Sequence, residues 1–203
     1  MKILIELPSW LGDTVMTTPA IENLLKHFGE VEITLLGSMV SIETLKNHPK
    51  VIKTYVLEKN YKNLYKTLKN LEGYDIFFSF RSSLRAKFTK FFISADRKYQ
   101  FDKKKYINLH QVEKYNNFVN ENLKINSSPD KLILHNQNNP KVYKTKLLGI
   151  NPGASYGSSK RWHPKKFASV AANLSNSYDI IIFGGAKEKN IAAEIENYLI
   201  DLV

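Results

Sequence analysis

The loop from Asn151 to Pro164, with the sequence NPGASYGSSKRWHP, carries the residue types that bind an anion. It follows an apolar stretch that predicts a strand, Lys146–Asn151. It precedes a predicted helix, Pro164–Ser175, because proline is favoured at the first helical position. Backbone N–H groups, serine hydroxyls, Lys160 and Arg161 before a helix N-terminus are groups that hold phosphate. The loop is therefore predicted to bind a phosphate, and the alternative is a solvated turn that happens to be basic.

The spacing within the loops excludes two common classes of nucleotide-binding site. In a Walker A loop the lysine directly follows the second glycine and precedes Ser or Thr. Here Ser158 and Ser159 separate Gly157 from Lys160. The loop after the first predicted strand contains Gly12 alone and no G-x-G-x-x-G pattern. Neither a P-loop nucleotidase nor a dinucleotide-dependent dehydrogenase is supported.

Asp13 is a candidate general base. It follows the first predicted strand, Lys2–Leu7, and opens a predicted amphipathic helix, Asp13–Phe28. Ligands of open α/β sheets bind where the parallel strands end. The helix dipole keeps a carboxylate in the first turn ionised, and Gly12 lets a ligand approach the backbone closely. The alternative is that Asp13 only caps its helix.

The segment Arg81–Lys105 is strongly basic, with nine basic and two acidic residues, and it includes Phe88, Phe91 and Phe92. One interpretation is a patch for a phosphorylated or membrane-embedded acceptor. The other is a solvated helix face with core aromatics.

The formal net charge of +11 predicts an anionic partner: nucleic acid, a membrane surface or a phosphorylated substrate. No helix-turn-helix, zinc or RNP motif is present, so nucleic acid is not expected.

The chain has no cysteine, which excludes thiolate and disulfide chemistry. The five histidines lack paired metal-ligand spacing, so no metal is expected. The N-terminal apolar run is too short for a signal peptide, and no run approaches the ~18–20 residues that span a bilayer, so we expect a cytoplasmic protein.

Strands alternate with helices, which predicts an α/β fold with a parallel sheet. After the first strand and helix, the expected strands are Val31–Leu36, Val51–Leu57, Asp75–Phe80 and Arg97–Phe101. The expected helices are Ser41–Asn47, Tyr61–Leu71, Ser82–Phe92 and Leu109–Leu123. Residues 1–123 are expected to form an N-terminal acceptor-binding domain, and residues 124–144 a linker with one short strand, Leu132–His135. Residues 145–203, with strands Lys146–Asn151 and Ile180–Phe183 and helices Pro164–Ser175 and Lys187–Leu199, are expected to be part of a nucleotide-sugar-binding domain.

Two motifs resemble the lipopolysaccharide heptosyltransferases, the ADP-heptose glycosyltransferases of family 9. The segment Leu11–Ile21, with the sequence LGDTVMTTPAI, looks like their L-G-D…P-A motif. The segment Asn151–Trp162 is similar to the P-G-A…K-R-W loop of the heptosyltransferase II branch, and Phe183–Lys187 is similar to the turn that follows. The resemblance implies the GT-B fold, with two Rossmann-like domains.

The resemblance also implies an inverting transfer of L-glycero-D-manno-heptose from ADP-heptose to the first heptose of the lipopolysaccharide inner core, without a metal or other cofactor. Asp13 matches the family's catalytic base. The residues implied in holding the donor diphosphate are Lys160, Ser155, Tyr156 and Gly153. The residues expected at the acceptor are Gly12, Arg81 and Arg85. The basic segment Arg81–Lys105 would face the anionic acceptor at the cytoplasmic surface of the inner membrane.

One family motif, a later Asp-x-Gly…His-Leu-Ala-Ala donor segment, has no counterpart in the 203 residues. The resemblance therefore implies that this chain is truncated and by itself inactive. Two alternatives remain open at this point. One is a basic non-enzymatic protein that binds nucleic acid or acidic lipid. The other is a GT-B enzyme that uses another nucleotide sugar.

Overall fold

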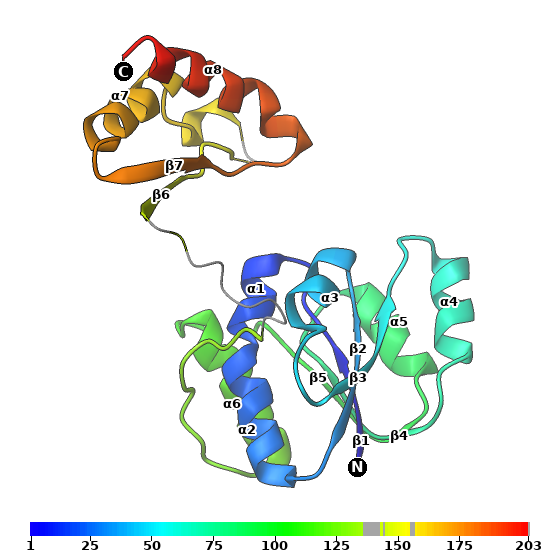
Figure 1. The fold of residues 1–203 in the computed structure, drawn as a ribbon. Coiled ribbons are helices and arrows are strands. Elements are labelled where there is room, and N and C mark those ends of the chain that lie inside the picture. The colour runs from blue at the N-terminus through cyan, green and yellow to red at the C-terminus, as the bar shows by residue number, and fades with distance from the viewer. Residues whose placement is uncertain (136–142, 144, 155–156, 203) are drawn as a thin grey trace. The chain divides into compact units, whose positions relative to one another are not determined.

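The computed structural model of the protein describes residues 1–135, 143, 145–154 and 157–202. The chain divides into two compact units, Met1–Asn138 and Asn139–Val203 (Figure 1). Each unit has its own parallel sheet and its own hydrophobic core. The division falls inside the segment 124–144, which the sequence predicts as a linker.

The first unit is built on a five-stranded parallel sheet with the strand order β3-β2-β1-β4-β5. Its strands are β1 (Lys2–Glu6), β2 (Glu32–Gly37), β3 (Val51–Val56), β4 (Tyr74–Ser79) and β5 (Ala95–Gln100). The central strand β1 pairs Ile3 with Ile33 on one side and with Ile76 on the other. The predicted α/β class and the five expected strands are confirmed, each within two residues of its expected bounds.

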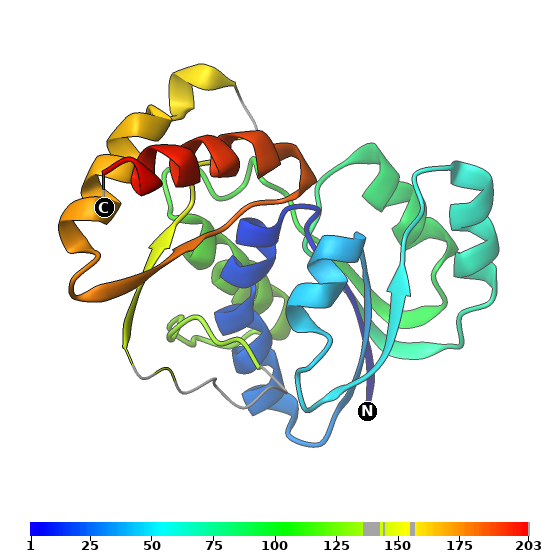
Figure 2. The ribbon, with the colours of Figure 1, turned by 45° about the horizontal axis from the view of Figure 1, so that its top comes forward.

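Consecutive residues of a strand point to opposite faces of the sheet, and here both sets are apolar. Helices therefore cover both faces. Ile3 and Ile5 face a core that includes side chains of α2 (Thr18–Phe28), α3 (Met39–Leu45) and α6 (Gln111–Leu123). Leu4, between them, faces a second core with side chains of α4 (Tyr61–Lys69) and α5 (Leu84–Phe92). Figure 2 shows α4 and α5 side by side, on the far side of the sheet from α2 and α6.

The helix predicted across Asp13–Phe28 is wrong in one respect: it is two helices, α1 (Leu11–Met16) and α2. Pro19 is the physical reason. It has no N–H to donate to the carbonyl of Val15, and its ring clashes with a carbonyl four residues earlier in a continuous helix. The Val15 carbonyl instead accepts from the Thr18 hydroxyl at 2.8 Å. Asp13 therefore lies on a short helix of its own.

The strand predicted at Leu132–His135 is also wrong, since these residues form no strand. The segment before them is held by side chains of two helices. The Asn23 amide donates to the Ser128 carbonyl at 2.9 Å, and the Asn120 amide donates to the Ser127 carbonyl at 2.9 Å. Further along, the Ile133 N–H donates to the Thr18 hydroxyl. These helix side chains provide the hydrogen bonds that a neighbouring strand would have provided.

The second unit contains two parallel strands, β6 (Lys146–Ile150) and β7 (Tyr178–Ile182), and two helices, α7 (Pro164–Leu174) and α8 (Lys189–Ile200). Its core is formed by Ile150, Ala168, Ala171 and Ile195. In Figure 1, α7 and α8 pack side by side over the two strands. The strand and the helix predicted on either side of the loop from Asn151 to Pro164 are confirmed, and α7 begins at Pro164 as expected. A short 3₁₀ helix, Ser158–Lys160, lies within the loop.

Candidate functional site

The first unit has an open pocket of about 780 Å³ at the edge of the sheet where the strands end. It is lined by Ser9 and Trp10 after β1, Ser38 and Met39 after β2, Leu57, Glu58, Lys59 and Tyr61 after β3, and Arg81 and Arg85 after β4. The chain leaves β1 toward β2 on one side, while β4 pairs on its other side. Ligands of open α/β sheets bind at such a switch in strand order. The pocket is therefore the candidate binding site of this unit.

Arg81 is positioned in the pocket by a buried carboxylate. Glu6, the last residue of β1, is 0% exposed, and its Oε1 accepts from Arg81 Nη1 at 3.4 Å. Its Oε2 accepts from the Ser79 hydroxyl at 2.6 Å. Burial raises the pKa of the Glu6 carboxyl, while the Ser79 hydrogen bond and the Arg81 charge partly offset that rise. Glu6 thus connects the centre of the sheet to a cation at the pocket wall.

Arg85 is positioned by main-chain carbonyls. Its guanidinium donates to the carbonyl oxygen of Lys59 at 2.6 Å and to that of Glu58. It also lies over the Tyr61 ring, 5.4 Å from the centroid. Because Arg81, Arg85 and Lys59 all line the pocket, an anionic ligand fits its charge. The structure thus brings together two of the three residues predicted at the acceptor.

Asp13 lies in the first turn of α1, as predicted, and is partly buried. It is not among the residues that line the pocket, although Trp10, just before α1, is. Among the described residues no hydrogen bond or ion pair engages the Asp13 carboxylate. Burial raises the pKa of the Tyr115 phenol on α6, and the nearby Asp13 charge raises it further. Asp13 therefore presents a carboxylate that no donor of the described chain occupies.

Gly12, the third residue predicted at the acceptor, has open space beside it. A Cβ added to Gly12 would meet no atom of the described residues within 4 Å. Packing within the described chain therefore does not require a glycine here. The predicted contact of a ligand with this part of the backbone stays a prediction.

In the second unit, the loop before α7 borders an open pocket of about 650 Å³. The pocket is lined by Ser159, Arg161, Trp162, His163, Pro164, Lys187, Asn190, Ile191 and Glu194. Lys160 is exposed at the end of the 3₁₀ helix, next to two of these residues. Ser155 and Tyr156, which were predicted at the donor diphosphate, lie outside the described residues.

Gly153 and Gly184 make room for the side chain of Glu188. A Cβ on Gly153 would come within 2.8 Å of Glu188 Cγ, and one on Gly184 within 2.7 Å of Glu188 Cβ. The Glu188 carboxylate accepts from the Gly185 N–H at 2.9 Å. The glycines therefore have a packing role in holding this loop, whatever ligand it binds. The role of Gly153 at a diphosphate stays a prediction.

Two neighbouring side chains fold back along the same loop. Arg161 Nη2 donates to the Ala154 carbonyl at 3.1 Å. Trp162 contacts the Phe167 ring edge-on, with centroids 5.2 Å apart, and Phe167 packs against the core of the unit. Trp162 therefore connects the loop to the core.

The basic segment Arg81–Lys105 does not form one surface. Arg81 and Arg85 lie at the pocket, and Lys87 and Lys90 lie on α5. Lys105 instead pairs with Glu121 of α6, on the opposite side of the sheet. Arg97 lies over the Phe28 ring of α2, also on that side. The sequence interpretation of a single basic patch is thus too broad, since strand β5 carries half of the segment to the other face.

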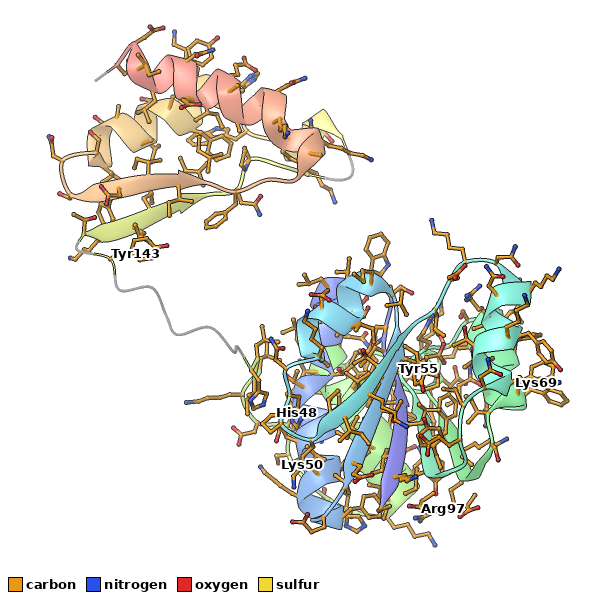
Figure 3. The ribbon with its side chains drawn as sticks, turned by 45° about the vertical axis from the view of Figure 1, so that its right-hand side comes forward. His48, Lys50, Tyr55, Lys69, Arg97 and Tyr143 are labelled. Atoms are coloured by element: carbon orange, nitrogen blue, oxygen red, sulfur yellow. The ribbon has the colours of Figure 1, made fainter. Side chains whose placement is uncertain are left out.

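Three possible metal ligands from distant parts of the chain meet in the first unit, although the sequence predicted no metal. Glu22 Oε1 lies 3.1 Å from His48 Nε2 and 3.9 Å from His135 Nε2. His48 Nδ1 accepts from the N–H of Lys50, its neighbour in Figure 3. A neutral His48 therefore has its proton on Nε2 and donates it to Glu22. Since a metal needs that nitrogen unprotonated, we interpret the cluster as a hydrogen-bonded one.

Sequence reasoning missed Glu6 as a residue of the site. The sequence did contain an indication of its role, because Glu6 is the only charged residue in the apolar run Ile3–Leu7. A charged residue in a strand that helices cover on both faces needs a partner. Its partners Ser79 and Arg81 lie more than seventy residues away in the sequence, so only the pairing of β1 with β4 identifies them.

Replacing Glu6 with glutamine is expected to stabilise the chain more at pH 8 than at pH 5. The folded-state pKa of Glu6 is raised above the ordinary 4.5. The folded state thus holds a proton that the unfolded state loses, and stability falls as the pH rises through this window. Glutamine does not ionise, so it removes this loss of stability. The loss is about 1.4 kcal/mol for each pH unit between the unfolded-state and the folded-state pKa of Glu6. Urea unfolding at both pH values measures the free energy of unfolding of the variant and of the wild type. Glu32→Gln, at an exposed position, is the control. A gain in stability that does not depend on pH would contradict the raised pKa of Glu6.

Two α/β units, each with its own parallel sheet, are the arrangement of a GT-B-type protein. Residues 61–201 match the family described as glycosyltransferase family 9 (heptosyltransferase). The chain belongs to this family.

The chain is 41% identical to the lipooligosaccharide heptosyltransferase 2 of Campylobacter jejuni serotype O:2, over 98% of this chain and 65% of that protein. It therefore spans about two thirds of the length of this relative. The family 9 glycosyl transferase of Veillonella parvula has a similar fold, with a TM-score of 0.78 at 20% identity, over 96% of this chain and 66% of that one. The E. coli heptosyltransferase WaaC, solved with ADP-2-deoxy-2-fluoro heptose, aligns with a TM-score of 0.72 at 14% identity, over 98% of this chain and 75% of that one.

Proposed function

We propose that this protein transfers L-glycero-D-manno-heptose from ADP-heptose to the first heptose of the lipopolysaccharide inner core. The observation that carries the proposal is the 41% identity to the Campylobacter heptosyltransferase 2 across nearly the whole chain. The E. coli relative solved with an ADP-heptose analogue supports the choice of donor. The cationic pocket of the first unit supports an acceptor that bears acidic groups.

In the proposed reaction Asp13 is the general base. Its carboxylate accepts the proton of an acceptor hydroxyl while the hydroxyl oxygen attacks the anomeric carbon of the heptose. The new carbon–oxygen bond forms as the bond from that carbon to the diphosphate oxygen breaks, and ADP leaves with the electron pair. Attack opposite to the leaving group inverts the anomeric configuration. A carboxylate that no donor of the described chain engages suits this role.

The leaving ADP gains negative charge, which the protein must stabilise. We assign this role to Lys160 and to the backbone N–H groups of the loop before α7, with Gly153, Ser155 and Tyr156 also at the donor. No metal is required in this proposal. Arg81 and Arg85 bind the acidic groups of the acceptor, and Gly12 allows the acceptor to approach.

The acceptor is attached to lipid, so the proposed location is the cytoplasm, with peripheral contact to the inner membrane. Among the described residues, no helix combines the length and the apolar character needed to cross a membrane. Nucleic acid is not a partner in this proposal.

Incubating the complete gene product with ADP-heptose and a core acceptor that ends in one heptose is expected to add one heptosyl residue and release ADP. Mass spectrometry detects the product, and NMR of the new linkage reports the anomeric configuration. Calorimetry with ADP, ADP-heptose and duplex DNA provides the control for charge alone. Transfer only from another nucleotide sugar would contradict the donor, and tight salt-dependent DNA binding without transfer would contradict the enzyme.

A further inference from the structure

Helix α5 is apolar on two opposite sides. Ala86, Thr89 and Ile93 at its end are buried toward the sheet. Leu84, Phe88, Phe91 and Phe92 follow one another at spacings of four, three and one, so they share the other side of the helix. Leu84 is 79% exposed and Phe91 is 77% exposed. An amphipathic surface helix places polar residues on its outward side, so this apolar outward side requires an explanation.

Helix α4 extends this apolar surface. Tyr61 contacts Phe88, with ring centroids 5.3 Å apart, and Tyr65 contacts Phe92 at 5.0 Å. Both tyrosines are exposed on α4, at 52% and 40%. The tyrosines and the outward residues of α5 therefore form one surface, which we call the aromatic face: Tyr61, Tyr65, Leu84, Phe88, Phe91 and Phe92.

Cations surround the aromatic face, and neither helix contains an acidic residue. The basic residues of the two helices are Lys62, Lys66, Lys69, Arg85, Lys87 and Lys90. Figure 3 shows Lys69 at the C-terminal end of α4. The acidic residues nearest to α4 in sequence are Glu58 and Glu72. Glu58 accepts a hydrogen bond from Asn63, and Glu72 forms ion pairs with Lys2 and Lys53. The surface thus combines exposed aromatic rings with the positive charge of two helices that contain no acidic residue.

We propose that the aromatic face docks the protein on an anionic lipid bilayer. Aromatic side chains with a polar tip favour the bilayer interface. Each lysine near an anionic leaflet adds electrostatic attraction, and stable binding at the interface needs both apolar insertion and charge. A second copy of this chain does not fit the same face, because two surfaces with only positive charge repel each other.

The aromatic face adjoins the pocket of the first unit. Tyr61 and Arg85, near the N-terminal ends of α4 and α5, line that pocket. Docking through the face places the pocket at the level of the lipid headgroups. A heptose attached to lipid then reaches the pocket without leaving the membrane. This benefit of docking rests on the proposed function.

Flotation of the complete gene product with vesicles tests the proposal. We expect binding to vesicles of phosphatidylglycerol with phosphatidylcholine, weaker binding to phosphatidylcholine alone, and release at high salt. Leu84→Ser with Phe91→Ser is expected to weaken binding at least about tenfold, since two exposed apolar side chains no longer insert. Lys62→Gln with Lys66→Gln is expected to weaken binding to the anionic vesicles about tenfold or more, with little effect on the neutral ones.

The matched control is Ile107→Ser with Ile200→Ser, which removes two apolar side chains of similar exposure outside the face. It is expected to bind vesicles like the wild type. Equal binding by the Leu84/Phe91 variant and the wild type would overturn the proposal, as would binding to duplex DNA without binding to anionic vesicles. Transfer to a delipidated, water-soluble core acceptor is measured separately. It is expected to be unchanged in the Leu84/Phe91 variant, so a failure of the proposed reaction is distinguished from a failure of docking.

Discussion

Replacing Asp13 with asparagine in the complete gene product is expected to lower kcat by about 10²- to 10⁴-fold, the usual contribution of a general base. Asparagine has nearly the same shape as aspartate but cannot accept the acceptor's proton. The Kd for ADP-heptose is expected to stay within about twofold, because the proposed donor contacts lie in the other unit. Steady-state kinetics and calorimetry measure the two quantities.

Asp96→Asn provides the control for removing a carboxylate, because Asp96 is exposed near the start of β5, whereas the pocket lies where the parallel strands end. It is expected to retain kcat. Asp13 lies in the first turn of α1, so its loss also removes a helix-dipole interaction of about 0.3–1 kcal/mol. Thermal unfolding of both variants measures this separately. Turnover near the wild-type rate in a folded Asp13→Asn protein would remove Asp13 as the base.

Replacing Lys160 with alanine is expected to weaken ADP-heptose binding by about 1.5–3 kcal/mol, the value of a lost charge-assisted hydrogen bond. This corresponds to a Kd about 10- to 150-fold higher. The same substitution is expected to lower kcat as well, because the diphosphate gains charge as ADP leaves. Calorimetry with ADP and with ADP-heptose measures the binding.

Lys146→Ala is the matched control. Lys146 is exposed at the start of β6, at the opposite end of the strand from the loop, so its loss changes the net charge equally. Lys160→Arg is expected to recover part of the affinity, since the positive charge remains. An unchanged Kd in Lys160→Ala, or an equal loss in Lys146→Ala, would show that the loop binds no diphosphate through this lysine.

The order and type of the elements were predictable because they depend on local patterns. Apolar runs separated by helical periods predicted the strands and the α/β class, and Pro164 predicted the start of α7. The prediction of a single helix across Asp13–Phe28 was wrong because it followed the apolar periodicity, whereas one proline, Pro19, divides the segment into two helices. The strand at Leu132–His135 was wrong because the Ile133 N–H donates to the Thr18 side chain of α2 instead of to a strand, and no local pattern reports such a partner.

Sequence alone determined which chemistry the chain can offer. The glycine- and serine-rich loop with Lys160, the carboxylate of Asp13 and the absence of Walker and dinucleotide spacing are properties of residues near one another in the chain. Such properties survive any arrangement of the elements. They were sufficient to predict an anion-binding loop and to suggest a family.

Only the tertiary structure decided which of these residues meet. The strand order places β4 beside β1, so Glu6 reaches Ser79 and Arg81 across more than seventy residues. The same order divides the basic segment between two faces of the sheet and leaves an aromatic side of α5 directed outward. Contacts between distant residues depend on strand pairing and helix packing, and these are set by burial over the whole unit rather than by any local stretch.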